Sequence, residues 1–204
     1  MTSHPKDLSD ELVEVMAQSD KICSHLHLPV QSGSSRVLEM MNRKYTRESY
    51  LELVGKLRKA MPDLSITTDI IVGFPGESEE EFQETCRFVE RIDFYETHIF
   101  KYSRRHGTVA DTMPDQLTEA VKAQRSDVLE KINGIHMIKF MTAVLDSKEE
   151  ILTEEQLIID NRTYTLGHTK NYIMMAVEGA YEKNLIISGT VAGFLQNNIM
   201  LLKI

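Results

Sequence analysis

The fold is decided by Leu64-Ser65-Ile66-Thr67-Thr68-Asp69-Ile70-Ile71-Val72, which runs directly into Gly73-Phe74-Pro75-Gly76. The first segment is rich in β-branched residues, and its second half is continuously apolar, as is typical of parallel strands covered on both faces. The Gly-Phe-Pro-Gly segment predicts a tight turn. Ser78 and Glu81 have the spacing of a capping box, which predicts that a helix begins here. Together they predict a strand–turn–helix unit of an α/β protein.

The same alternation extends over residues 1–137. Strands are expected at Ile22–Val30, Leu64–Val72 and Thr97–Tyr102. Helices are expected after Ser9, from Ser35 to Asn42, and after Thr46, Ser78 and Pro114. This order indicates βαβ units on a parallel sheet.

The pattern changes near Ile138, where the helical period ends. Five short strands separated by turn residues are then expected: Met141–Leu145, Gln156–Ile159, Tyr172–Glu178, Leu185–Thr190 and Asn198–Ile204. They predict a small all-β barrel. Two domains follow, 1–137 and 138–204, with no Gly/Ser/Pro-rich linker between them.

Composition narrows the class of protein. The 204 residues include 31 acidic and 23 basic side chains, for a net charge of −8, which disfavours non-specific nucleic-acid binding. The chain has no apolar run of membrane-spanning length, and its polar N-terminus argues against a signal peptide. The two cysteines exclude a disulfide framework and any three-cysteine metal site, and they favour a cytoplasmic location.

Four segments carry a family resemblance: Thr2–Leu8 (TSHPKDL), His25–Ser34 (HLHLPVQSGS), Thr68–Glu77 (TDIIVGFPGE) and Phe100–Thr108 (FKYSRRHGT). In this order and spacing they resemble the radical SAM methylthiotransferases that modify tRNA. The segment Gly167–Tyr172 (GHTKNY) is similar to the TRAM domain at the end of those enzymes. The resemblance implies an α/β fold, with a partial (β/α) radical SAM barrel followed by a small all-β, TRAM-like (OB-like) barrel.

The resemblance also implies the chemistry. A 4Fe-4S cluster cleaves S-adenosyl-L-methionine (SAM), and a methylthio group is added to a hypermodified adenosine of tRNA, next to the anticodon. The first 90 residues look closest to the branch that acts on isopentenyl-adenosine. The part from Thr97 onward looks closer to the branch that acts on threonylcarbamoyl-adenosine, so both substrates stay open.

Two parts of the family pattern are missing. The CxxxCxxC cluster motif is absent, and Cys23 and Cys86 lie too far apart to replace it. The N-terminal domain of the family is absent too. The chain therefore resembles the C-terminal half of the enzyme, whose missing N-terminal half is an expected partner. The isolated chain is expected to lack a cluster and activity, and to leave the edges of Ile22–Val30 and Thr97–Tyr102 unpaired. A non-catalytic RNA-binding or scaffold fragment is the alternative function.

The residues assigned to SAM binding are Gln31, Ser32, Gly33, Asp69, Val72, Gly73 and Tyr102. They lie on or just beyond strands, where the barrel loops of such enzymes bind ligands. For Gln31–Gly33 and for Val72–Gly73 the alternative is ordinary turn structure. For Asp69 it is a structural ion pair.

The residues assigned to RNA binding are Lys101, Arg104, Arg105, His106 and Lys170. Arginine and lysine bind phosphates, and this charge is concentrated on an otherwise acidic chain. A second basic cluster, Arg36, Arg43, Lys44 and Arg47, is as consistent with solvated charge as with RNA binding.

No metal ligands are assigned. Cys23, His25 and His27 alternate and would share one face of a strand, but the pattern lacks a fourth ligand. Catalytic residues cannot be named from the sequence.

Overall fold

The computed structural model describes residues 1–204 and divides into two compact units. The first comprises Met1–Ile22 and Leu26–His136, and the second comprises Cys23–His25 and Met137–Ile204. The division near residue 136 falls inside the long helix α6 (Glu119–Thr142), without an irregular linker.

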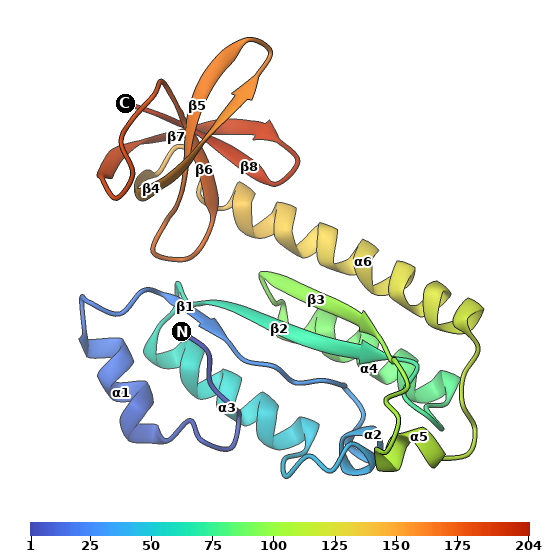
Figure 1. Ribbon diagram of the computed structural model, residues 1–204. Helices are drawn as coiled ribbons and strands as arrows, with labels where there is room; N and C mark the ends of the chain where they lie inside the picture. Colours follow the sequence, from blue (N-terminus) through green and yellow to red (C-terminus); the bar gives the residue numbers. More distant parts are fainter. The chain divides into compact units, whose positions relative to one another are not determined.

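A three-stranded sheet with the order β1-β2-β3 forms the centre of the first unit (Figure 1). Its strands are β1 (His25–His27), β2 (Ser65–Val72) and β3 (Glu96–Lys101). β2 and β3 are parallel and pair from Thr67↔Glu96 to Val72↔Lys101, so their carboxyl ends lie side by side. The other helices are α1 (Asp10–Gln18), α2 (Ser35–Met40), α3 (Arg47–Ala60), α4 (Glu79–Ile92) and α5 (Val109–Thr112).

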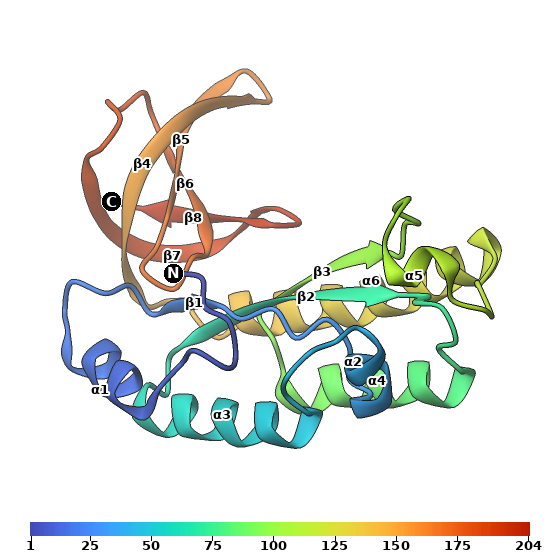
Figure 2. The same ribbon diagram turned by 60° about the horizontal axis from the view of Figure 1, so that its bottom comes forward.

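Side-chain caps explain where the predicted helices begin. Ser9, Thr46 and Ser78 each accept a hydrogen bond from a backbone N–H in the first helical turn. The predicted capping box of Ser78 and Glu81 is present at the start of α4. The apolar faces of α3 and α4 pack under one face of the sheet (Figure 2). The buried residues include Tyr50, Val54, Leu57, Phe82, Cys86 and Val89 from the helices and Leu26, Leu28, Ile66 and Ile70 from the strands.

Both outer strands of this sheet are partly covered. Residues before α1 run alongside β1, where Thr2 forms a parallel bridge to His27 and the His27 N–H donates to the Met1 carbonyl (2.8 Å). On β3, the N–H of Thr97 donates to Asn133 Oδ1 of α6 (2.7 Å). The expectation of two bare strand edges is therefore wrong at these points.

The second unit is a closed five-stranded barrel with the order β4-β5-β6-β8-β7. Its strands are β4 (Lys148–Ile159), β5 (Arg162–His168), β6 (Met174–Glu178), β7 (Ile186–Gln196) and β8 (Ile199–Lys203). β4 pairs with both β5 and β7, and this closes the barrel. Its buried cluster contains Tyr164, Leu166, Ala176 and Ile199.

Apart from shifted strand ends in the barrel and the unpredicted short helix α5, four predictions differ from the structure. The strand expected at Ile22–Val30 is limited to His25–His27, since Pro29 has no N–H to donate. The helix expected after Pro114 begins only at Glu119, and it continues through Met141, where a strand was expected. β5 was not predicted at all.

Candidate functional site

The candidate site lies where β2 and β3 end. Val72 is paired with Lys101 in the register of the two strands, so the turn after β2 and the loop after β3 start at the same edge of the sheet. An open pocket of about 470 Å³ lies here, within the usual size of a small-molecule site. Its lining residues are Lys101, Tyr102, Ser103, Arg104, Gln116, Leu117, Glu119 and Lys122. Residues assigned separately to SAM and to RNA are thus brought together.

Tyr102 is the best supported of the residues assigned to SAM. Its hydroxyl is buried and has no hydrogen-bond partner. Its ring meets Phe74 edge to face, with 5.3 Å between the ring centres. A buried hydroxyl without a partner is costly, which marks this group as available to a ligand.

Lys122 of α6 was missed by the sequence analysis. Its side chain is 6% exposed, and its Nζ donates to the Tyr102 carbonyl (3.0 Å) and to Glu119 (2.8 Å). The same Nζ lies 5.4 Å from the centre of the Tyr102 ring. A buried positive charge therefore stands beside the predicted ligand-binding tyrosine, and no local signal in the sequence marked it.

Val72 and Gly73 have structural partners of their own. Val72 is fully buried, and its carbonyl accepts the Tyr102 N–H (2.9 Å). Gly73 has φ of 73° and donates its N–H to Glu77 Oε2 (2.7 Å). A Cβ at position 73 would lie 2.4 Å from Lys122 Cγ. These contacts favour the turn interpretation of Val72 and Gly73, because both polar groups are already engaged.

A buried ion pair holds this turn in place. Arg125 Nη1 lies 2.6 Å from Glu77 Oε2, and the two side chains are 6% and 1% exposed. Burial raises the pKa of Glu77, against the lowering effects of the Gly73 N–H and Arg125. Both charges are therefore committed to connecting the turn with α6, and neither was singled out in the sequence.

The loop after β1 is also held by internal bonds. Gln31 has φ of 72° and bridges to β2, its N–H donating to the Asp69 carbonyl (2.9 Å). Ser32 Oγ accepts the Ser34 N–H (3.2 Å). A Cβ on Gly33 would lie 2.6 Å from Thr85 Cα of α4, so packing alone requires glycine there. The structural alternative is thus favoured for Ser32 and Gly33.

Three of the residues assigned to RNA follow β3. Arg104 Nε pairs with Asp111 Oδ1 at 3.0 Å, and its Nη2 donates to the Asp111 carbonyl at 2.5 Å. Arg105 is exposed, and the exposed His106 lies 3.6 Å from Asp111. Arg104 therefore shapes the loop, while Arg105 presents its charge to solvent.

The remaining assigned residues lie elsewhere. Lys170 is exposed on the turn between β5 and β6 of the barrel. In the second basic cluster, Arg36 is bound by Glu81 and Arg47 by Glu48, at 2.5 and 2.7 Å. Arg36 and Arg47 are thus engaged in ion pairs, and the choice between solvated charge and RNA binding for this cluster stays a prediction.

The cysteines do not fit an iron–sulfur cluster. Cys23 is exposed and Cys86 is buried on α4, where burial raises its thiol pKa to about 11. A 4Fe-4S cluster needs clustered thiolates, which two cysteines in such different surroundings do not provide. No helix has both the length and the apolar character needed to cross a membrane.

In a comparison with known protein families, residues 1–89 match the Radical SAM superfamily. A tRNA-2-methylthio-N(6)-dimethylallyladenosine synthase from Thermoanaerobacter sp. (strain X514) is 57% identical over 140 residues, which cover 68% of this chain and 30% of that protein. A synthase of the same name from Alkaliphilus oremlandii is 48% identical over 180 residues, 88% of this chain and 38% of that protein. The chain thus spans 30% to 38% of the length of these two relatives.

A solved structure supports the fold. The coproporphyrinogen III oxidase of Escherichia coli, described as a radical SAM enzyme, has a TM-score of 0.51 at 20% identity, over 70% of this chain and 31% of that one. At this identity the likeness concerns the fold alone.

Proposed function

We propose that this chain contributes the SAM- and tRNA-contacting part of a longer enzyme, a radical SAM tRNA methylthiotransferase, because it matches the Radical SAM superfamily and 30% to 38% of the length of the two synthases. That enzyme adds a methylthio group to a hypermodified adenosine next to the tRNA anticodon. The observation that carries the proposal is the pocket at the ends of β2 and β3, where Tyr102 and Lys122 lie beside the basic loop. We place the enzyme in the cytoplasm.

The relatives favour one of the two substrates. Both relatives described above are named as dimethylallyladenosine synthases, and their matched segments cover 68% and 88% of this chain. We therefore propose dimethylallyl- (isopentenyl-) adenosine as the target. The threonylcarbamoyl alternative, suggested by the second half of the sequence, is disfavoured.

SAM, when bound with a reduced cluster, supplies the radical chemistry of this family, and the cluster would be held outside this chain. Within the chain, the Tyr102 hydroxyl is placed to hydrogen-bond a ligand in the pocket. Lys122, whose Nζ is paired with Glu119, adds a further charged group to the lining of the pocket. The other two residues of the proposed set are Gln31, four residues after β1, and Asp69, inside β2, whose side chain is 26% exposed.

The RNA-binding role is assigned to the basic loop and the barrel. Arg105, His106 and Lys101 offer positive charge at the strand ends, and Lys170 does so on a barrel turn. We propose that the barrel is TRAM-like and binds RNA with one face, as small β-barrels commonly do. The rival function, an RNA-binding fragment without catalysis, would use these residues but would not bind SAM.

The test uses the 204-residue chain and a tRNA that carries dimethylallyl-adenosine. We expect Arg105→Ala to weaken tRNA binding and to lower the slope of log affinity against log salt by about one unit or slightly less. Arg87→Ala, an exposed arginine on α4, is the matched control and should leave both unchanged. Arg104→Ala is less informative because it also releases Asp111.

Two outcomes would refute parts of the proposal. An unchanged salt slope in Arg105→Ala would remove this loop from RNA binding. SAM titrated into the same proteins should bind wild type and lose affinity in Tyr102→Phe. Absence of SAM binding alongside intact tRNA binding would establish the rival function.

A further inference from the structure

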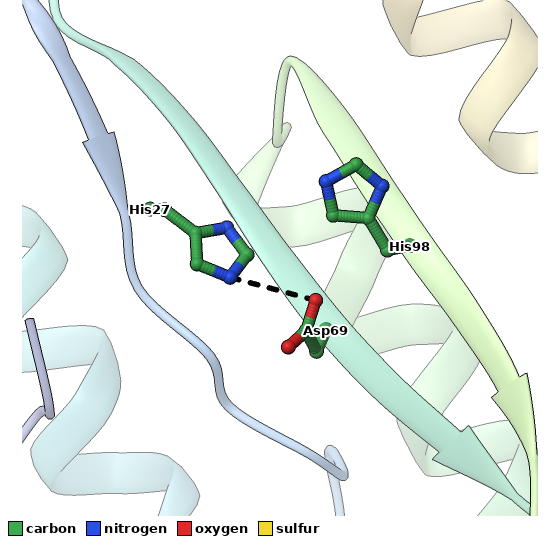
Figure 3. Close-up of side chains that lie close together, drawn as sticks. All are labelled: His27, Asp69 and His98. Carbon is green, nitrogen blue, oxygen red and sulfur yellow. Dashed lines mark ion pairs between the residues drawn. The ribbon is translucent and has the colours of Figure 1, made fainter. Parts of the chain in front are cut away.

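Three potential metal ligands lie on neighbouring strands of the first unit, outside the pocket described above. They are His27 of β1, Asp69 of β2 and His98 of β3 (Figure 3). Asp69 and His98 are direct partners in the strand register. Their sequence neighbours Leu28, Ile70 and Thr97 are buried, so by strand alternation the trio projects from the other face of the sheet.

The ligand atoms of the trio are close. His27 Nε2 lies 3.5 Å from Asp69 Oδ1, and one ligand atom from each of the three residues lies within 4.8 Å of the others. We propose that His27, Asp69 and His98 bind a single divalent transition-metal ion such as Zn²⁺. Two imidazoles and one carboxylate are a donor set that suits such ions, and three protein ligands leave a coordination position open for an exogenous ligand.

A fourth residue orients the first ligand. His27 Nδ1 is hydrogen-bonded to Thr67 Oγ1 at 2.9 Å, which directs the opposite ring nitrogen, Nε2, toward Asp69. Histidines that bind metals usually have such a partner on the second ring nitrogen. When Nδ1 carries the proton, Nε2 presents a lone pair to a carboxylate oxygen. Two electron-rich atoms facing each other at this distance require a positive charge between them, either a proton or a metal ion.

The site is open enough for an ion to enter and for the ligands to close on it. The side chains of His27 and Asp69 are 20% and 26% exposed. His98 is 44% exposed, so its ring has room to turn. Metal–ligand bonds of about 2.0–2.2 Å place tetrahedral ligands roughly 3.4 Å apart. The His27–Asp69 distance already matches this spacing, and rotation of the His98 ring closes the rest.

This proposal replaces the expectation of no metal ligands. The sequence pattern Cys23, His25 and His27 had suggested ligands along one strand, whereas the structure joins His27 to residues about 40 and 70 positions away. The site shares Asp69 with the residues assigned to SAM, but its three donors all lie within this chain, so metal binding measured without SAM tests it independently of the proposed function.

The experiment titrates Zn²⁺, and separately Co²⁺, into the tag-free 204-residue chain. We expect saturable binding of one ion, with visible Co²⁺ bands typical of nitrogen and oxygen ligands. His98→Ala and Asp69→Asn should each weaken binding at least tenfold. Thr67→Val should weaken it about tenfold by freeing the His27 ring.

The chain offers a matched control. His106 lies 3.6 Å from Asp111, a histidine–carboxylate pair to which no second histidine is added. His106→Ala should bind the ion as tightly as wild type. Circular dichroism should confirm that each variant is folded, including Thr67→Val at its buried position.

Three results would overturn the site. One is the absence of saturable binding, which would leave a proton between His27 and Asp69. Another is unchanged affinity in both His98→Ala and Asp69→Asn. The last is a sulfur-to-cobalt charge-transfer band that disappears in Cys23→Ser, which would assign the ion to the exposed thiol.

Discussion

The parallel sheet and the barrel differ in how the backbone hydrogen-bonding groups of their strands are paired. In the barrel every strand has two neighbours, because β7 pairs with β4 and closes the ring. The three-stranded sheet ends at β1 and β3, and covers them locally with Thr2 and Asn133. The chemically distinctive groups, the unpartnered Tyr102 hydroxyl and the His27–Asp69–His98 trio, belong to the open sheet. The unit with the open sheet is thus the one that carries both proposed ligand sites.

Both units contain glycines that allow close contacts, at Gly33 and Gly73 in the first and at Gly167 and Gly189 in the barrel, and the first unit adds a buried ion pair. In the first unit a buried ion pair, Glu77–Arg125, connects the turn after β2 to α6. In the barrel, glycines allow backbones to touch: a Cβ at Gly167 would lie 2.2 Å from the Leu152 carbonyl oxygen, and one at Gly189 would lie 2.5 Å from that of Lys203. The contribution of the ion pair in the first unit and that of the glycine contacts in the barrel should be separable by mutation.

The largest loss of stability is expected from Arg125→Met, because this change leaves Glu77 buried without its partner. Breaking a buried pair in this way costs about 3–5 kcal/mol. Hydrogen exchange followed peptide by peptide should show the loss of protection in residues 1–136 and not in β4 to β8. The double variant Glu77→Gln/Arg125→Met should recover part of the loss. Equal loss in both units would mean that they unfold as one.

Gly167→Ala should act on the barrel alone. The added methyl group meets backbone atoms that cannot move aside, which costs about 1–3 kcal/mol. The same substitution at Gly55, on an exposed face of α3 with no atom within 4 Å, is the control and should stabilise its helix by about 0.5–1 kcal/mol. Urea unfolding compared with hydrogen exchange in each unit checks both. If Gly167→Ala left the free energy of unfolding unchanged, β4 and β5 could move apart without a loss of stability.

The smallest loss of stability, about 1 kcal/mol, is expected from Glu81→Gln at the start of α4. The hydrogen bond from Arg36 lowers the pKa of Glu81, assisted by the Ser78 N–H. Because the folded-state pKa lies below the unfolded one, this stabilisation is present above the ordinary carboxyl pKa and is lost as the pH falls through the lowered value. The free energies of unfolding of wild type and variant should thus differ at neutral pH and become equal in acid. A difference that is constant with pH would mean that the charge of Glu81 contributes nothing.

Local sequence signals predicted much of the first unit. The strands at Leu64–Val72 and Thr97–Tyr102 agree with β2 and β3 within one residue at each end, since their β-branched content and their turns are local properties. The caps at Ser9, Thr46 and Ser78 are local too. In the barrel, β5 was missed because glycine is typical of turns, whereas the structure uses Gly167 for close contact inside the strand.

The site could be predicted only in part. The sequence indicated the strand ends and Tyr102, because residues after parallel strands share an edge. It did not indicate Lys122 or Arg125, which reach the turn from a helix some 50 residues further along the chain. Nor did it separate Arg104 from Arg105, since the partner Asp111 belongs to the short helix α5, which was not expected.

Cys23 and Cys86 differ in exposure, so their rates of modification by a thiol reagent report on local opening of the structure. A thiol reagent should modify exposed Cys23 quickly, which also provides a single attachment point for a fluorescent or spin label. Cys86, shielded on α4 with its thiol pKa raised to about 11, should react only when that helix detaches from the sheet. Its modification rate in the absence of denaturant therefore measures how often the first unit opens.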